Sequence, residues 1–304
     1  MAHKLALHSV SYAGLWGQAY LSPEQFIDKT AELGFDGVML MAKRPHLSVL
    51  DYDGAACGRL RAHLEKNKLQ AICLAGYTNF TGDLEHGDIP QREIQIQHVT
   101  GLARMAHDLG CDLVRVFTGY EHTAAGYSAQ WKMIVEALRE CAKRASAFDV
   151  TIGVQNHHDI ASGYESLSDL IAAVNEPNCK ALFDAWAPAL QGADLADAAA
   201  CLGGVTVHTT LANYVLRPRY KYDPNLVNYL PQPAAVQAVP MNDGFIDYHT
   251  FLGALWDRGF TGSIAYEMCS PLRDGNSIEV LDSYARQFLE YMAEISAEKT
   301  ASPR

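Results

Sequence analysis

The sequence predicts a (β/α)8 TIM barrel, a single α/β domain with a long loop after strand 7. Short apolar runs of four to seven residues, rich in β-branched side chains, recur along the chain, as expected of strands buried on both faces. Segments with helical spacing of apolar residues lie between them. This alternation implies a parallel sheet with right-handed crossovers, and eight such units close into a barrel. A doubly wound open sheet is the alternative.

The predicted strands and helices are bounded by recognisable end signals. Ser22 is placed as a helix N-cap, Pro23 as the first helical residue and Gln25 as the capping-box partner, while Gly34 ends that helix. The predicted strands are 5–10, 37–41, 70–76, 113–119, 151–157, 180–186, 205–210 and 263–268. Further helices are predicted at 88–109, 128–148, 166–174, 247–256 and 277–295.

Two segments depart from this pattern. Residues 211–245 are rich in Tyr, Pro and Asn and show no clear period, so we expect a long loop that acts as a lid, a binding loop or an interface arm. A decorative insertion is the alternative. We assign the barrel to residues 1–296 and expect the polar segment 297–304 to be a flexible tail.

Composition excludes some classes of function. The net charge of −11 argues against nucleic acid as a partner, because phosphate backbones require a basic face. No apolar run approaches the roughly 18 residues of a membrane span, and the first residues lack the features of a secretory signal, so we expect a cytoplasmic protein. The seven cysteines lack a CxxC pair and are expected to be reduced core thiols.

Polar residues at the predicted carboxyl ends of the strands indicate a site, because barrels of this type carry their active sites there. Asp184, His208 and Glu267 each interrupt an apolar strand, and burying such groups without partners costs several kcal/mol. A satisfied core residue explains any one of them equally well. Three on consecutive strands favour a shared divalent cation, with Gln155 adding an oxygen. This mixed O/N set suits Mn²⁺, with Mg²⁺ or Co²⁺ as alternatives.

The chain resembles the xylose-isomerase-like sugar phosphate isomerase/epimerase barrels over nearly its whole length. Their typical ligands are a Glu, an Asp, a His and a Glu on strands 5 to 8, and Asp184, His208 and Glu267 match the last three. The first departs, since the stretch "VENH" of many relatives reads "VQNH" here. Gln155 can offer a carbonyl oxygen but has no useful basicity.

The glutamine limits the chemistry that the resemblance implies. Epimerases of this superfamily place one carboxylate on each face of the substrate, and an amide removes that symmetry. Proton abstraction next to a ketone, with a single strong base, remains possible. Glu267 and His157 are the candidate catalytic residues. By strand alternation His157 points the same way as Gln155 and His158 faces away, although His157 could equally hold the metal ligands in place.

The segments "RPRYKY", "VQAVPMNDGFIDY" and "AYEMCSPLRDG" resemble the catalytic α subunits of bacterial C-glycoside deglycosidases. That resemblance implies a metal-dependent lyase that acts on a 3-keto-glycoside, eliminates the aglycone and works with a small β subunit; a homo-oligomer is the alternative assembly. The alternative activity is a metal-dependent epimerase or isomerase of free keto-sugars. DNA repair is disfavoured by the acidic charge, and an inactive barrel would follow if Gln155 abolished metal binding.

Five further residues are candidates for substrate binding. Arg217 and Arg219 follow strand 7, where relatives use an arginine to grip substrate oxygens, although surface ion pairs explain them equally well. His46 follows strand 2, where an ordinary loop histidine is the alternative. Tyr77 and Asn79 follow strand 3 and are placed to contact a sugar or an aromatic aglycone.

Overall fold

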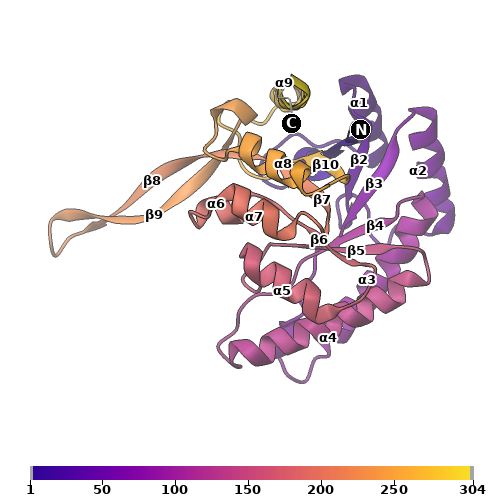
Figure 1. The fold of residues 1–304 in the computed structure, drawn as a ribbon, viewed down its shortest axis with the longest axis horizontal. Coiled ribbons are helices and arrows are strands. Elements are labelled where there is room, and N and C mark those ends of the chain that lie inside the picture. Colours follow the sequence, from indigo (N-terminus) through magenta and orange to yellow (C-terminus); the bar gives the residue numbers. More distant parts are fainter. Residues whose placement is uncertain (1–2, 302–304) are drawn as a thin grey trace.

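The computed structural model describes residues 3–301, and within these residues a closed barrel of parallel strands forms the centre of the molecule (Figure 1). Going round the barrel, the order is β1-β10-β7-β6-β5-β4-β3-β2. The barrel strands are β1 (Leu5–His8), β2 (Gly37–Met41), β3 (Gln70–Ala75), β4 (Leu113–Val116), β5 (Thr151–Gln155), β6 (Cys179–Leu182), β7 (Thr206–Leu211) and β10 (Ser263–Tyr266). The predicted TIM barrel is therefore confirmed.

Helices connect the strands on the outside of the barrel (Figure 1). They are α1 (Pro23–Leu33), α2 (Gly54–Lys66), α3 (Gln91–Leu109), α4 (Tyr127–Ser146), α5 (Tyr164–Val174), α6 (Trp186–Leu190), α7 (Leu195–Leu202), α8 (Tyr248–Asp257) and α9 (Ile278–Ala301). Short 3-10 turns are η1 (Ser9–Tyr12), η2 (Gly82–Leu84) and η3 (Met241–Asp243). Helix α9 includes the first residues of the segment for which we expected a flexible tail, and residues 302–304 lie outside the described residues.

The ends of α1 follow the predicted chemistry. The Ser22 hydroxyl accepts from the Gln25 amide while the Gln25 side chain accepts from the Ser22 amide, and Pro23 stands at the first turn. Gly34 ends the helix with φ 91°, a left-handed conformation that glycine adopts without steric cost. Local sequence thus fixes both ends of this helix.

The segment after β7 is not the long loop that we expected. Residues 213–239 form an antiparallel hairpin, β8 (Asn213–Asp223) paired with β9 (Asn228–Val239), which projects from the barrel (Figure 1). We call this hairpin the arm. The expectation failed because the segment 213–239 contains four prolines, which argue against a strand, and they outweighed the short alternation of apolar and basic residues at 216–222.

The barrel interior is divided into an apolar and a polar part. A small cluster of buried side chains from the barrel strands packs together, consisting of Ala6, Met39, Ile72, Cys73, Ala75, Leu113, Leu182 and Ala265. The larger core contains side chains from the helices and the strands, and it covers the outer face of the barrel. All seven cysteines are free in the structure. Five are buried, namely Cys57, Cys73, Cys111, Cys141 and Cys179, whereas Cys269 is partly buried and Cys201 is exposed, so the expectation of a core thiol is wrong for Cys201.

Candidate active site

Strand geometry explains why polar groups gather above the apolar cluster. Side chains two positions apart on a strand point to the same face. Within β1 and β4, Ala6 and Leu113 of the cluster are therefore followed, two positions later, by His8 and Arg115 on the same side. Asp184 and Glu267 come just after β6 and β10, and hydrogen bonds from the Thr210 amide and from His8 hold them at the same edge. Gln155 ends β5 at the same edge, so the polar residues collect at the carboxyl ends of the strands.

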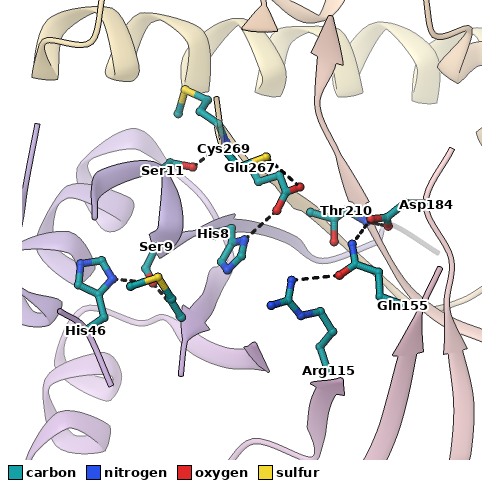
Figure 2. A network of polar contacts seen from close by, with 12 residues as sticks. His8, Ser9, Ser11, His46, Arg115, Gln155, Asp184, Thr210, Glu267 and Cys269 are labelled. Carbon is teal, nitrogen blue, oxygen red and sulfur yellow. Dashed lines mark hydrogen bonds and ion pairs between the residues drawn. The ribbon is translucent and has the colours of Figure 1, made fainter. Parts of the chain in front are cut away.

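Gln155 links an acidic and a basic side chain (Figure 2). Its amide nitrogen donates to Asp184 Oδ2, and its amide oxygen accepts from Arg115 Nη1 at 3.0 Å. A carboxylate at this position would accept from Arg115 but would have no proton to donate to Asp184. The glutamine is thus the residue that satisfies both neighbours at once.

Asp184 is held by contacts on both sides. Its Oδ1 accepts from the Thr210 amide at 2.8 Å, and its backbone exchanges hydrogen bonds with the Asn156 side chain. Without a bound cation, burial and the nearby Glu267 charge raise the pKa of Asp184 to about 8. A cation placed near the two carboxylates would relieve this cost.

Arg115 is a site residue that the sequence analysis missed. It is 3% exposed, donates from Nη2 to Gly76 O at 3.0 Å, and lies 4.1 Å from the Phe117 ring centroid and 4.7 Å from that of Tyr77. A Cβ on Gly76 would meet Arg115 O at 2.7 Å, so only glycine permits this close approach of β3 and β4. The available signal was a charged residue inside the apolar run "LVRVF".

Glu267 is the more accessible carboxylate of the site. It follows β10 and its side chain is 13% exposed, whereas Asp184 is 8% exposed. Burial would raise the pKa of Glu267, but the hydrogen bond from His8 Nδ1 at 3.0 Å and the charge of Arg115 outweigh burial and lower it. Burial also lowers the pKa of His8, so a neutral imidazole donates to an ionised carboxylate.

His208 has the geometry of a ligand imidazole but lies deeper than the carboxylates. Its Nδ1 contacts Ser263 Oγ at 2.7 Å, and its Nε2 is buried without a partner. The register pairs His208 with Leu182, whereas Asp184 lies two residues further along. Within residues 3–301 no group of three or more His, Cys, Asp and Glu side chains is placed to hold a metal ion.

The predicted ligands Gln155, Asp184, His208 and Glu267 therefore share one region without forming a finished metal cage. Arg115 and Asp184 bind both ends of the Gln155 amide, and His8 binds Glu267. The donor types still fit a divalent cation, because the same region offers two carboxylates and an imidazole nitrogen that lacks a partner.

Several buried polar atoms in this region have no hydrogen-bond partner in the described part of the chain. They are His8 Nε2, Arg115 Nε, Trp186 Nε1, His208 Nε2 and Thr210 Oγ1. Native interiors leave few such atoms unsatisfied, so their concentration at one edge of a barrel indicates a place where a polar ligand binds. The cavity lined by Gln70, Leu113, Thr151 and Ser263 lies at the opposite edge, where the strands begin.

His157 lies beside this network, but not for the reason that we expected. Strand β5 ends at Gln155, so alternation does not govern the next residues. His158 has φ 68° and turns back, and its Nδ1 lies 2.9 Å from His157 Nδ1; the expectation that it faces away is wrong. The His157 ring stacks on Phe117 at 4.5 Å, and burial and Arg115 lower its pKa.

The five candidate substrate-binding residues fall into different environments. Tyr77 is half-buried beside Arg115, with Lys43 Nζ 4.1 Å from its ring centroid. The Asn79 side-chain oxygen accepts from Thr81 Oγ1 at 2.8 Å and so holds its own loop. Arg217 and Arg219 are exposed on the arm, outside the buried network, and Arg217 donates to Gln237 there.

His46 is an interior residue. It is 3% exposed, its Nδ1 contacts Ser9 Oγ at 3.0 Å and its Nε2 contacts Leu21 O at 3.1 Å. Both ring nitrogens are thus engaged by the protein. The structure supports the alternative of an ordinary structural histidine, and the expected substrate contact lacks a free ring nitrogen.

His46 predicts a pH dependence of stability. Burial lowers the pKa of His46 to about 4 from 6.5, so the unfolded chain binds more protons between these values. The free energy of unfolding should therefore fall on acidification from 6.5 towards 4, with His46 contributing up to about 1.4 kcal/mol per pH unit. Urea unfolding at several pH values should show that the free energy of unfolding changes less with pH in His46→Gln than in the wild type. An equal change with pH would contradict this role of His46. The control is His86→Gln, which replaces an exposed histidine.

No helix among the described residues is long and apolar enough to cross a membrane.

Comparison with known proteins identifies the family. A model of the xylose isomerase-like TIM barrel matches residues 27–288. No curated protein sequence matches. The D-psicose 3-epimerase of Clostridium cellulolyticum H10 superposes with a TM-score of 0.72 at 18% identity, over 96% of this chain and 99% of that one. The 3-keto-D-glucoside 4-epimerase YcjR of E. coli gives 0.69 at 13%, over 96% and 100%.

A third structure, the IolI protein with a bound zinc atom, gives a TM-score of 0.73 at 14% identity, over 97% of this chain and 98% of that one. At such identities the superpositions establish the shared barrel. The family match covers most of the sequence and agrees with the closed barrel and with the polar edge of its strands. This chain belongs to the xylose isomerase-like TIM barrel family.

Proposed function

We propose that the protein is a carbohydrate enzyme that removes a proton from the carbon next to a ketone of a keto-sugar, as an epimerase or isomerase. The observation that carries the proposal is the pair of Glu267 and His8 beside buried Arg115 (Figure 2). It provides an ionised base and a fixed positive charge at one edge of the barrel. Two structural neighbours are described as sugar epimerases, which supports the same class of substrate.

The residues have separate roles in this proposal. Glu267 takes the proton, because it is the accessible ionised carboxylate. Arg115 stabilises negative charge that develops on the substrate oxygen, as fixed cations do in buried sites. His157 is half-buried, and we assign it the return of a proton from a second direction, for which its imidazole must first take up a proton from solvent.

The chemistry of the donor set also supports a divalent cation. Asp184, His208 and Glu267 would hold it, and the Gln155 oxygen, which uses one lone pair to accept from Arg115, would contribute its other lone pair. When bound, such an ion polarises a carbonyl oxygen. The neighbour with a zinc atom supports a divalent ion in general, and we propose Mn²⁺, with Mg²⁺ or Co²⁺ as alternatives, from the oxygen-rich donors.

A second candidate is favoured by Gln155. With an amide in place of an acid, the site has only one carboxylate that can act as a strong base on the substrate. One base is sufficient for the elimination of an aglycone from a 3-keto-glycoside. We propose this lyase, assisted by a small β subunit, as the alternative activity. The resemblance of segments around the arm to C-glycoside deglycosidases supports it.

Solvent deuterium separates the two activities. The protein is incubated in D₂O with divalent metal and either D-psicose or a 3-keto-glucoside. An epimerase or isomerase gives deuterium at the carbon next to the ketone, in a sugar of altered structure, whereas a lyase releases the aglycone. If neither deuterium uptake nor aglycone release occurs with these substrates, with and without metal and also after the small β subunit is added, both proposals fail.

Changing Gln155 to Glu should strengthen metal binding. The new carboxylate cannot donate to Asp184, and the two acids would then need a cation between them. We expect the affinity for Mn²⁺ to rise on the order of tenfold, because an added anionic ligand raises affinity. Calorimetric titration and elemental analysis measure this directly. Gln237→Glu, on the arm, is the control, and an unchanged affinity in Gln155→Glu would show that residue 155 does not face the ion.

A further inference from the structure

The arm exposes apolar side chains that a monomer would ordinarily bury. Strand alternation and the cross-strand pairs place Leu216, Tyr220, Tyr222, Tyr229 and Pro231 on one face. The rings of Tyr222 and Tyr229 lie 5.3 Å apart, which agrees with this placement. Tyr220 and Tyr229 are each 64% exposed. We call this set the aromatic face of the arm.

The opposite face of the arm is basic. Arg217, Arg219 and Lys221 alternate with the aromatic residues on β8 and are all exposed. Residues 213–239 contain these three cations and one anion, Asp223, whereas the whole chain carries −11. The remainder of the chain therefore carries −13, so the arm is opposite in charge to the body from which it projects.

The tip of the arm carries exposed apolar residues that are unusual for a solvent-exposed hairpin turn. Leu226 and Val227 are 62% and 77% exposed, and Val227 has φ 47°. Hairpin turns favour Asn, Asp and Gly, and a β-branched residue in the left-handed region costs about 1–2 kcal/mol. A two-stranded hairpin is moreover marginally stable alone in water. The base of the arm is anchored by buried Asn213, Tyr214 and Val239, but its distal half packs against no other described element.

We propose that the arm docks on the acidic body of a second copy of this chain, with its aromatic face and apolar tip buried and its basic face paired with carboxylates. The charge difference selects the partner, because a body of −13 attracts an arm of opposite sign and repels another body. Large exposed apolar patches on soluble proteins mark such interaction surfaces. The proposal is independent of the activity of the barrel.

Sedimentation velocity of the purified full-length protein tests the assembly. We expect a mass that is a multiple of the 33.3 kDa chain at micromolar concentration, and dissociation as salt is raised. Three variants should each raise the dissociation constant at least about tenfold. They are Tyr220→Ser with Tyr229→Ser, the triple reversal Arg217→Glu, Arg219→Glu and Lys221→Glu, and Leu226→Asn with Val227→Gly.

The third variant separates loss of contact from loss of folding. An Asn-Gly pair suits the turn better than Leu226-Val227, so the arm should fold at least as well while its apolar tip is removed. The matched charge control reverses three exposed cations elsewhere, Arg59, Lys66 and Lys68, and should leave the mass unchanged. A monomeric wild type overturns the proposal, as does an oligomer that all three variants leave intact. A complex formed only with a different, smaller protein would also overturn it.

Discussion

Replacing Glu267 by glutamine is expected to reduce deuterium exchange next to the ketone by about 10³-fold, within the range that a general base supplies. The amide keeps the size of the side chain and can still contact His8 Nδ1, but it cannot accept the substrate proton. The fold should survive, because Glu267 lies just after the last barrel strand and is not part of the apolar core between the barrel and the helices. Exchange into sugar is followed by mass spectrometry.

The control for this prediction is Glu290→Gln, which removes an exposed carboxylate on α9. Its exchange rate should equal that of the wild type. Circular dichroism of both variants shows whether the fold is intact, and elemental analysis shows whether bound metal is retained, so that the loss of exchange can be assigned to the missing base. Should Glu267→Gln retain more than about a tenth of the rate, a fraction well above what loss of a base allows, His157 becomes the leading base, and His157→Gln should then show the large loss instead.

The barrel could be predicted because its signals are local and repeated. The capping box at Ser22 and the left-handed Gly34 each determine an end of α1 without help from the rest of the chain. The arm could not be predicted in this way. Its strands lack a buried face, so hydrophobic alternation, which reflects burial, gives a weak signal.

The sequence indicated which residue types gather at the site but not how they are arranged. Asp184, His208 and Glu267 were singled out because polar residues interrupt apolar strands, and their role as ligands stays a prediction. Their depths depend on strand register, such as the pairing of His208 with Leu182, which the sequence of one chain does not show. His158 was misplaced because alternation stops where β5 ends.

The role of Gln155 depends on residues that are distant in the sequence. The sequence alone indicates only that an amide stands where relatives have an acid. In the structure it completes a hydrogen-bonded chain from Arg115 to Asp184, two residues far apart in the sequence. The amide and the arginine therefore form one unit, and the arginine is the part whose removal should be most costly.

Replacing Arg115 by methionine is expected to lower the free energy of unfolding by about 3 kcal/mol, the range for removing one partner from a buried charged network. Gly76 O and the Gln155 oxygen would lose their hydrogen-bond donors. The pKa of Asp184, already raised by burial and by Glu267, would rise further, because the positive charge of Arg115 lowers it. Methionine fills most of the same space, so a cavity contributes little. Equilibrium unfolding in urea, without added metal, measures the difference.

Arg104→Met separates this network from ring contact alone. Arg104 is exposed and lies 5.6 Å from the Phe148 ring centroid, so its loss should cost less than about 1 kcal/mol. If both variants lost similar stability, Arg115 would act only by stacking on Phe117 and Tyr77.

Added Mn²⁺ gives a further test, because a divalent ion can replace the lost positive charge between Asp184 and Glu267. Arg115→Met should therefore regain more stability with Mn²⁺ than the wild type gains, whereas Arg104→Met should respond as the wild type does.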